Sequence, residues 1–413
     1  MTAQPPEVSK PATGPGDRPV PMRTWIRPVL LVMCACGVSQ GFARFTFSFV
    51  LPDMTADVLG SYGVAGLLGG AHLGAYLLGV LGTTTLARRA EGTGLLKAGL
   101  ASTALGLLLT AVAPWTWLLF AGLTLTGLSS AAVWIPAPSI VAAHVPRHRN
   151  GLAIGLVTAG IGITIAITGP AVTLLQRLFG AGTWRPVWGL AATVAVLVLV
   201  AQVLFLRPVG AHPDAGPERR PLRALFPEVR TLLLSYFLYG VGFALYTNYL
   251  IAALQHDLGF DVASATGTFS LLGVASIFGG LVGGRLSDSL GRRRTLVAFL
   301  AVIGAAPLAV PLRWHAAIQL SVLLYGLLMT GIGTVLMAYL GDRQGPGDIS
   351  AAFGVTTMSL GLAQFLAPPL GGRLADVSGS FDSTFYLASG TAVLAAVVSA
   401  FLPDGGRLRG RRP

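Results

Sequence analysis

Residues 264–294 read SATGTFSLLGVASIFGGLVGGRLSDSLGRRR, an apolar segment followed by one acidic residue and three consecutive arginines. The apolar part, 264–286, is close to the ~20 residues that a helix needs to cross ~30 Å of hydrocarbon. A basic loop beside such a segment is typical of the cytoplasmic face of a membrane protein. The stretch therefore predicts a membrane-spanning helix that ends in the cytoplasm.

The same kind of segment recurs along the whole chain. A helix satisfies all its backbone hydrogen bonds internally, whereas the ~10-residue alternating segments of a β-barrel are absent. The predicted fold class is therefore all-α integral membrane, with twelve transmembrane helices. They are predicted near 27–51, 61–84, 94–113, 116–142, 151–175, 184–206, 231–254, 264–286, 294–312, 315–340, 349–371 and 383–402.

The composition excludes a soluble enzyme. Of 413 residues, 53% are hydrophobic and only 11% are charged, against about 25% charged in typical soluble domains. So few charges cannot coat a water-soluble protein of this size. The lipid bilayer is therefore the expected environment of most of the chain.

The net charge of +12 suggests nucleic-acid binding at first sight, but the positions of the cations indicate membrane topology instead. With a cytoplasmic N-terminus, 23 of the 28 Lys and Arg residues fall on the cytoplasmic side. This asymmetry predicts that both termini are cytoplasmic and that nucleic acid is not a partner. The opposite side holds four cations, namely Arg177, Arg185, Arg313 and Arg373.

The longest polar gap divides the predicted spans into six plus six. The halves share short patterns at nearly constant offset, for example GFA at 41–43 and again at 242–244. Internal repeats of this kind are common in secondary transporters. The predicted organisation is a disordered cytoplasmic N-tail (1–26), a six-helix bundle (27–206), a cytoplasmic linker (207–230), a second six-helix bundle (231–402) and a basic cytoplasmic tail (403–413).

The loop after the eighth span resembles the signature loop of the major facilitator superfamily: Gly, three residues, Asp, two residues, Gly, then basic residues. The resemblance covers residues 27–402 and implies a secondary transporter with two six-helix bundles. Residues 41–54, GFARFTFSFVLPDM, resemble the first helix of a bacterial subgroup whose members mostly have no assigned substrate. The resemblance also implies a multi-pass protein of a bacterial cytoplasmic membrane.

The signature loop is expected to form a cytoplasmic gate; the alternative is a basic loop without a switching role. A glycine permits close helix approach, and an acid at a helix end can pair with arginines or with a helix N-terminus. The gate residues are Gly284, Asp288, Gly291, Arg292 and Arg293. The corresponding loop after the second span has Leu86 in place of the acid. GRLAD at 372–376, on the outer side, is interpreted as a coincidental echo.

Arg44 is the one cation deep inside a predicted span. A charge near the bilayer centre costs about 2.5–3.5 kcal/mol on insertion scales, so it is expected to face a water-filled cavity or a partner. Arg44 either binds an anionic substrate group, controls a proton site, or has a structural role. Helical spacing places Gly37, Gln40, Gly41 and Ser48 on the same face, which is predicted to line a central cavity.

Other polar or aromatic residues within spans are candidates for substrate binding or coupling, with ordinary packing as the alternative for each. A histidine titrates near neutral pH and could carry a coupling proton. These further candidates are Gln40, His72, Tyr76, Trp134, Tyr246, Asn248 and Gln364.

No Asp or Glu lies in the middle of a predicted span, although proton-coupled carriers commonly use a buried carboxylate. No phosphate-binding loop and no metal-ligand motif occur in the sequence. We therefore expect no enzyme activity, no catalytic residues, no metal and no cofactor.

The sequence predicts a monomeric secondary active transporter that moves a small organic solute by alternating access. Protons are the candidate coupling ion, and Arg44 favours an organic anion as substrate. The alternative is a proton-coupled efflux pump for drug-like or natural-product compounds. A more remote alternative is a non-transporting membrane receptor, although neither the N-tail nor the linker has room for a sensory domain.

Overall fold

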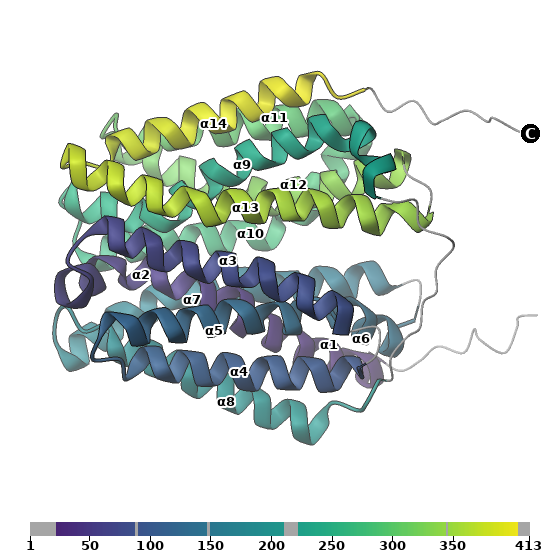
Figure 1. The fold of residues 1–413 in the computed structure, drawn as a ribbon, viewed down its shortest axis with the longest axis horizontal. Coiled ribbons are helices and arrows are strands. Elements are labelled where there is room, and N and C mark those ends of the chain that lie inside the picture. The colour runs from purple at the N-terminus through teal and green to yellow at the C-terminus, as the bar shows by residue number, and fades with distance from the viewer. Residues whose placement is uncertain (1–21, 87–89, 147–148, 210–221, 344–345, 404–413) are drawn as a thin grey trace, which may run out of the picture.

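A computed structural model describes residues 22–86, 90–146, 149–209, 222–343 and 346–403 (Figure 1). Within these ranges the secondary structure is helical and no strand occurs. The all-helical prediction is therefore confirmed for the described part of the chain. The predicted tails 1–26 and 403–413 fall largely on residues outside these ranges, as does the middle of the predicted linker, 210–221, whereas 222–230 form the start of a helix.

Each predicted span coincides with a helix or with consecutive helical segments. The first contains the π-helical segment Gly37–Phe42, a second π-helical segment, Thr55–Leu59, follows it, and the ninth includes a 3-10 turn, Ala306–Ala309. The α-helices are α1 Met22–Cys36, α2 Ala43–Met54, α3 Tyr62–Leu86, α4 Gly92–Ala111, α5 Thr116–Trp134, α6 Ala137–His144, α7 Asn150–Phe179, α8 Arg185–Phe205, α9 Leu222–His256, α10 Val262–Leu290, α11 Arg292–Ala305, α12 His315–Arg343, α13 Pro346–Ser378 and α14 Asp382–Ala400.

Ten helices among the described residues are long and apolar enough to cross a membrane. The predicted spans 294–312 and 349–371 are not among the ten. The first corresponds to α11, which has only 14 residues, and a short 3-10 turn; the second corresponds to α13, whose apolar residues alternate with Gly, Ser, Thr, Gln and Pro. The membrane fold class is confirmed, whereas twelve crossings and the side of the termini stay predictions.

The outer surface of the helices is apolar, as contact with lipid tails requires. A shallow groove between α4 and α8 is lined by Leu105, Leu108, Val196 and Leu197, all exposed. In a water-soluble protein such side chains would form the core. The helices therefore expose apolar surface outward while burying polar groups between them.

The helices pack as two groups that follow one another in the sequence, α1–α8 and α9–α14. The two groups lie on opposite sides of the molecule (Figure 1). Within the first group α4 packs on α5 and α8, and within the second α10 packs on α12. Between the groups the main contacts are α3 with α13 and α7 with α10. Both termini of the described chain lie at one end, called here the linker end, because α8 ends and α9 begins there (Figure 1). The opposite end is called the far end.

At the far end the two groups approach closely enough to require glycine. A Cβ on Gly372 of α13 would lie 2.0 Å from the Tyr62 carbonyl oxygen of α3, and one on Gly66 would lie 2.3 Å from the Pro368 carbonyl oxygen. In the other main contact, a Cβ on Gly169 would lie 2.5 Å from the Thr266 carbonyl oxygen. Backbone-to-backbone packing of this kind lets helices associate without large side chains.

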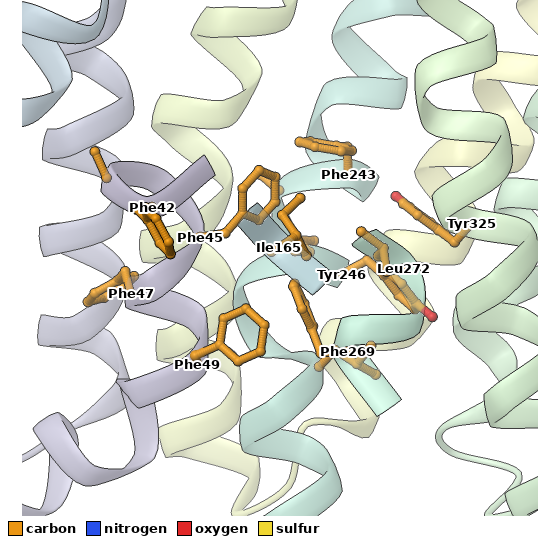
Figure 2. Close-up of a cluster of buried hydrophobic side chains, with 14 of the residues drawn as sticks. Phe42, Phe45, Phe47, Phe49, Ile165, Phe243, Tyr246, Phe269, Leu272 and Tyr325 are labelled. Carbon is orange, nitrogen blue, oxygen red and sulfur yellow. The ribbon is translucent and has the colours of Figure 1, made fainter. Parts of the chain in front are cut away.

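An aromatic cluster fills the space between the groups on the far side of Arg44. Figure 2 shows Phe45 and Phe49 of α2 pointing toward Phe269 of α10, with ring-centroid distances of 6.4 and 4.9 Å. All three side chains are nearly inaccessible to solvent. The cluster therefore separates the middle of the molecule from its far end.

Toward the linker end the two groups separate. Gly155 lies two helical turns from Gly162 on the same face of α7, yet a Cβ on Gly155 would meet nothing within 4 Å. Gly280 lies two turns from Gly273 on α10, and its only neighbour is Thr334 of its own group. The contacts between groups in the described chain are thus concentrated in the middle and at the far end.

Candidate functional site

Arg44 lies near the middle of the continuous 35-residue helix Trp25–Leu59. Its guanidinium nitrogen Nη2 donates a hydrogen bond of 2.9 Å to Oε1 of Gln364 on α13, in the opposite group. The Gln364 side chain is buried, whereas Arg44 keeps part of its surface accessible. The structure therefore brings together two of the predicted site residues, from positions 320 residues apart.

Aromatic rings surround this pair. The Arg44 guanidinium carbon lies 5.4 Å from the ring centroid of Phe243 on α9 and 5.6 Å from that of Phe45. Such distances allow cation–π attraction. Tyr76 on α3 and Tyr239 on α9 also lie near Arg44. Arg44 thus lies among aromatic side chains, with the Gln364 amide as its hydrogen-bond partner.

In the described part of the chain, Arg44 has no carboxylate partner. The ion pairs found there involve Asp57, Asp257, Asp288, Asp342 and Asp382, and each of them lies at a helix end. A buried charge without a counterion is costly, and one neutral amide oxygen offsets only part of that cost. The arrangement can therefore accept an anion that pairs with the free donors of the guanidinium.

The prediction that Gly37, Gln40, Gly41 and Arg44 share one cavity-lining face is wrong. Gly41 packs against Thr164 of α7, and Gln40 donates to the Ser130 carbonyl oxygen of α5 over 3.2 Å. The physical reason is the π-helical segment Gly37–Phe42, in which hydrogen bonds span five residues instead of four and the face rotates. Gln40 therefore fastens the first helix to α5, while Arg44 faces the opposite group.

His72 of α3 is held inside the first group. Its Nδ1 lies 2.9 Å from the Leu123 carbonyl oxygen and 3.1 Å from the Thr126 hydroxyl, both on α5. The side chain is only 6% exposed. This geometry favours a packing role, which was the alternative to proton coupling.

We expect His72→Phe to lower thermal stability while leaving the KM for substrate within about twofold. The substitution removes the hydrogen bonding of Nδ1 to α5, while the Thr126 hydroxyl still donates to the Leu123 carbonyl oxygen, so the expected cost is about 0.5–1.5 kcal/mol. Thermal unfolding of the purified protein together with transport kinetics in proteoliposomes checks this. A stable variant with a displaced pH profile would point instead to proton coupling.

Tyr246 lies within the second group and does not face Arg44. It is fully buried, stacks on Tyr325 of α12 at 4.0 Å, and its hydroxyl lies 3.3 Å from that of Ser321. The aromatic residues of α9 that approach Arg44 are Phe243 and Tyr239. The sequence contained one signal for them, because Phe243 belongs to the GFA repeat.

Asn248 and Trp134 are half-buried, and neither contacts Arg44 in the contacts found among the described residues. The Asn248 side-chain amide donates to the Ala244 carbonyl oxygen one turn earlier, over 2.7 Å. Trp134 ends α5 and packs against the core of the first group. Of the eight candidates, Arg44 and Gln364 are in direct contact, and Tyr76 and His72 lie near Arg44.

The predicted gate loop between α10 and α11 is joined to its own group. Arg292 donates to Asp288 over 2.5 Å and to Asp342 of α12 over 3.0 Å. Gly291 has a positive φ of 91°, a backbone conformation that glycine adopts without strain. Arg293 donates to the Leu402 carbonyl oxygen after α14. These contacts join the loop to helices of the second group, and a Cβ on Gly284 would lie 3.9 Å from Thr334 of α12.

Comparison with known proteins gives consistent matches over most of the chain. A family model described as "Uncharacterised MFS-type transporter YbfB" matches residues 36–400. Inner membrane transport protein YdhP of Escherichia coli O157:H7 is 30% identical over 304 residues, 71% of this chain and 75% of that protein. Monocarboxylate transporter 11 of Mus musculus is 29% identical over 325 residues, 73% and 70% of the two chains. Monocarboxylate transporter 13 of Bos taurus is 26% identical over 372 residues, 88% and 83%. The matched range includes helices of both groups.

Proposed function

Because this chain belongs to the major facilitator superfamily of membrane transporters, we propose that it carries small organic anions across a bacterial cytoplasmic membrane by alternating access. In this mechanism two helical bundles, here α1–α8 and α9–α14, rock about a site near the membrane midplane. Arg44 and Gln364 lie where such a site is required, one on each side of the boundary between the groups. The transporter acts as a monomer, since both halves of the site come from one chain.

One observation carries the choice of substrate: Arg44 is a mid-helix cation without a carboxylate partner in the described chain. An arginine fork matches a carboxylate with two parallel hydrogen bonds. A carboxylate would complete the coordination that Gln364 begins, and the rings of Phe45 and Phe243 would contact an apolar or aromatic body. The names of two relatives, monocarboxylate transporters 11 and 13, agree with this substrate class.

The proposed orientation places the linker end in the cytoplasm. Cations such as Lys97, Arg285 and Arg294 lie toward the linker end, as the positive-inside rule requires for a cytoplasmic face. The groups are in contact at the far end and separate toward the linker end. The described conformation is then the inward-facing state, from which substrate is exchanged with the cytoplasm.

A proton gradient is proposed as the driving force. A bound anion neutralises Arg44, so a carrier loaded with one anion and one proton bears the same single positive charge as the empty carrier. Movement of one proton with each anion makes the whole cycle electroneutral. Proton coupling does not require a carboxylate at the centre of the site in this scheme, and no proton-carrying residue is assigned.

The test is transport by the purified protein in proteoliposomes with imposed pH gradients. Benzoate, phenylacetate and lactate serve as anions, and benzyl alcohol and benzylamine are matched neutral and cationic controls. We expect saturable transport of at least one anion, accelerated by a pH gradient that is acidic on the side of origin, and no transport of the controls. Preferential transport of benzylamine would contradict the proposal and favour a drug efflux pump. Transport of none of these compounds would also count against it.

A further inference from the structure

The Asp376 carboxylate at the end of α13 binds the beginning of α3 in the other group. Its Oδ1 accepts a hydrogen bond from the Tyr62 backbone N–H over 2.9 Å, and its Oδ2 accepts one from the Gly63 N–H over 2.7 Å. The first N–H groups of a helix have no partner within the helix and carry partial positive charge. A carboxylate is a well-matched acceptor for them.

We propose that Asp376 is the latch of the far-end gate: its carboxylate holds the start of α3 against α13 and so stabilises the state that is closed at this end. The proposal rests on the alternating access proposed above. Opening the far end must separate α3 from α13, which breaks both hydrogen bonds. Asp376 is therefore a positioning residue that acts on the balance between two states and does not touch the substrate.

Around Asp376, the start of α3 packs closely against several helices of the second group. The Tyr62 ring packs edge-on against Phe381, with centroids 4.7 Å apart, and edge-on against His256 at 6.2 Å. Gly372 leaves room for the Tyr62 carbonyl, as described above, and Arg373 lies beside Gly63. Tyr62 is thus held by α13, α14 and α9 together, so that the Asp376 contact joins the first group to several helices of the second.

A comparison with the linker end supports the assignment. Asp376 ends GRLAD at 372–376, and Asp288 ends GRLSD at 284–288. In this conformation Asp376 joins the two groups, whereas Asp288 pairs with Arg292 inside the second group. The pattern first interpreted as a coincidental echo places a carboxylate against a helix N-terminus at the closed end of the molecule.

Spin labels on the full-length protein measure the gate directly. Cys34 and Cys36 are replaced by serine, and a label pair at Ala181 and Leu312 reports on the far end. A second pair at Leu86 and Leu290 reports on the linker end. Both pairs join one position in the first group to one in the second. Distance distributions from double electron–electron resonance spectroscopy then give the populations of the far-end-open and far-end-closed states.

We expect Asp376→Ala to raise the ratio of far-end-open to far-end-closed molecules about 30-fold, the effect of losing two charge-assisted hydrogen bonds in one state. The linker-end distance should shorten in the same samples. Asp376→Glu, which keeps the charge, should restore part of the closed population. The matched control is Asp382→Asn, because Asp382 is a far-end acid that pairs with Arg313 inside its own group. This control should leave the distances unchanged.

Unchanged far-end distances in Asp376→Ala, or changes equal to those of Asp382→Asn, would overturn the latch. If the alanine variant does not fold, Asp376→Asn tests the same loss of charge with the side-chain volume retained. These distances are measured without substrate. Failure to transport any of the three anions therefore overturns the proposed function while leaving the latch intact. Unchanged distances overturn the latch while leaving the proposed function intact.

Discussion

Arg44→Gln is expected to reduce transport of the organic anion at least about 100-fold. The substitution removes the charge that binds the carboxylate and leaves that carboxylate without a partner in an apolar site. Truncating one member of a buried, hydrogen-bonded charge pair costs about 2–5 kcal/mol, or about 30- to 5,000-fold, and a 100-fold loss corresponds to about 2.8 kcal/mol within that range. Transport kinetics in proteoliposomes measure the effect, with kcat and KM determined separately.

Two further variants and a measurement of thermal stability separate substrate binding by Arg44 from a structural role. Arg44→Lys keeps the positive charge but loses the planar fork, so an intermediate loss of about tenfold is expected. Arg177→Gln removes an exposed far-end arginine and should change transport less than twofold. Because Arg44 has no carboxylate partner in the described chain, its loss should not lower the melting temperature. An unstable Arg44→Gln protein with unchanged transport would indicate a structural role.

Gln364→Glu is expected to abolish anion transport to a similar extent, by about 100-fold. The new carboxylate would lie at the position of Oε1, 2.9 Å from the Arg44 guanidinium, and would form the ion pair that the substrate forms in the wild-type protein. An attached carboxylate competes at a far higher effective concentration than a free one. The same ion pair should raise the melting temperature, since it compensates a charge that is already buried.

Gln364→Leu is the matched control because it removes the amide oxygen without adding charge. It should leave kcat largely intact and change KM by less than about tenfold. The double variant Arg44→Gln with Gln364→Glu completes a double-mutant cycle, in which strong non-additivity of the melting temperatures is expected for contacting residues. Wild-type anion transport by Gln364→Glu would contradict the placement of the substrate at this pair.

Much of the fold could be predicted because membrane-spanning helices are recognisable in a sequence as long apolar segments. Arg44 and Gln364 were also identifiable, since a polar side chain is conspicuous in such a segment. Their pairing was not identifiable. It depends on how α2 and α13 pack, and no local pattern relates two residues 320 positions apart.

Errors in the site arose where helix geometry departs from the regular period. The π-helical segment before Arg44 rotates Gln40 and Gly41 away from the face that a regular helix predicts. On α9, Tyr246 and Phe243 are equally aromatic in sequence and both are buried, but Phe243 also lies against Arg44, which only the packing of α2 on α9 reveals. GRLAD at 372–376 is interpreted as an echo because it lies on the outer side, and the partner of Asp376 is a pair of backbone N–H groups, which no side-chain motif marks.

The central claim is that Arg44 is the anion-binding residue, and equilibrium binding of benzoate to purified protein tests it most directly. Isothermal titration of the wild-type protein and of Arg44→Gln, with benzyl alcohol as the neutral analogue, separates the charge from the aromatic body. We predict that benzoate binds the wild-type protein and that its affinity falls at least about 100-fold in Arg44→Gln. Benzyl alcohol should not discriminate between the two proteins. Equal benzoate affinity of both proteins would contradict the claim.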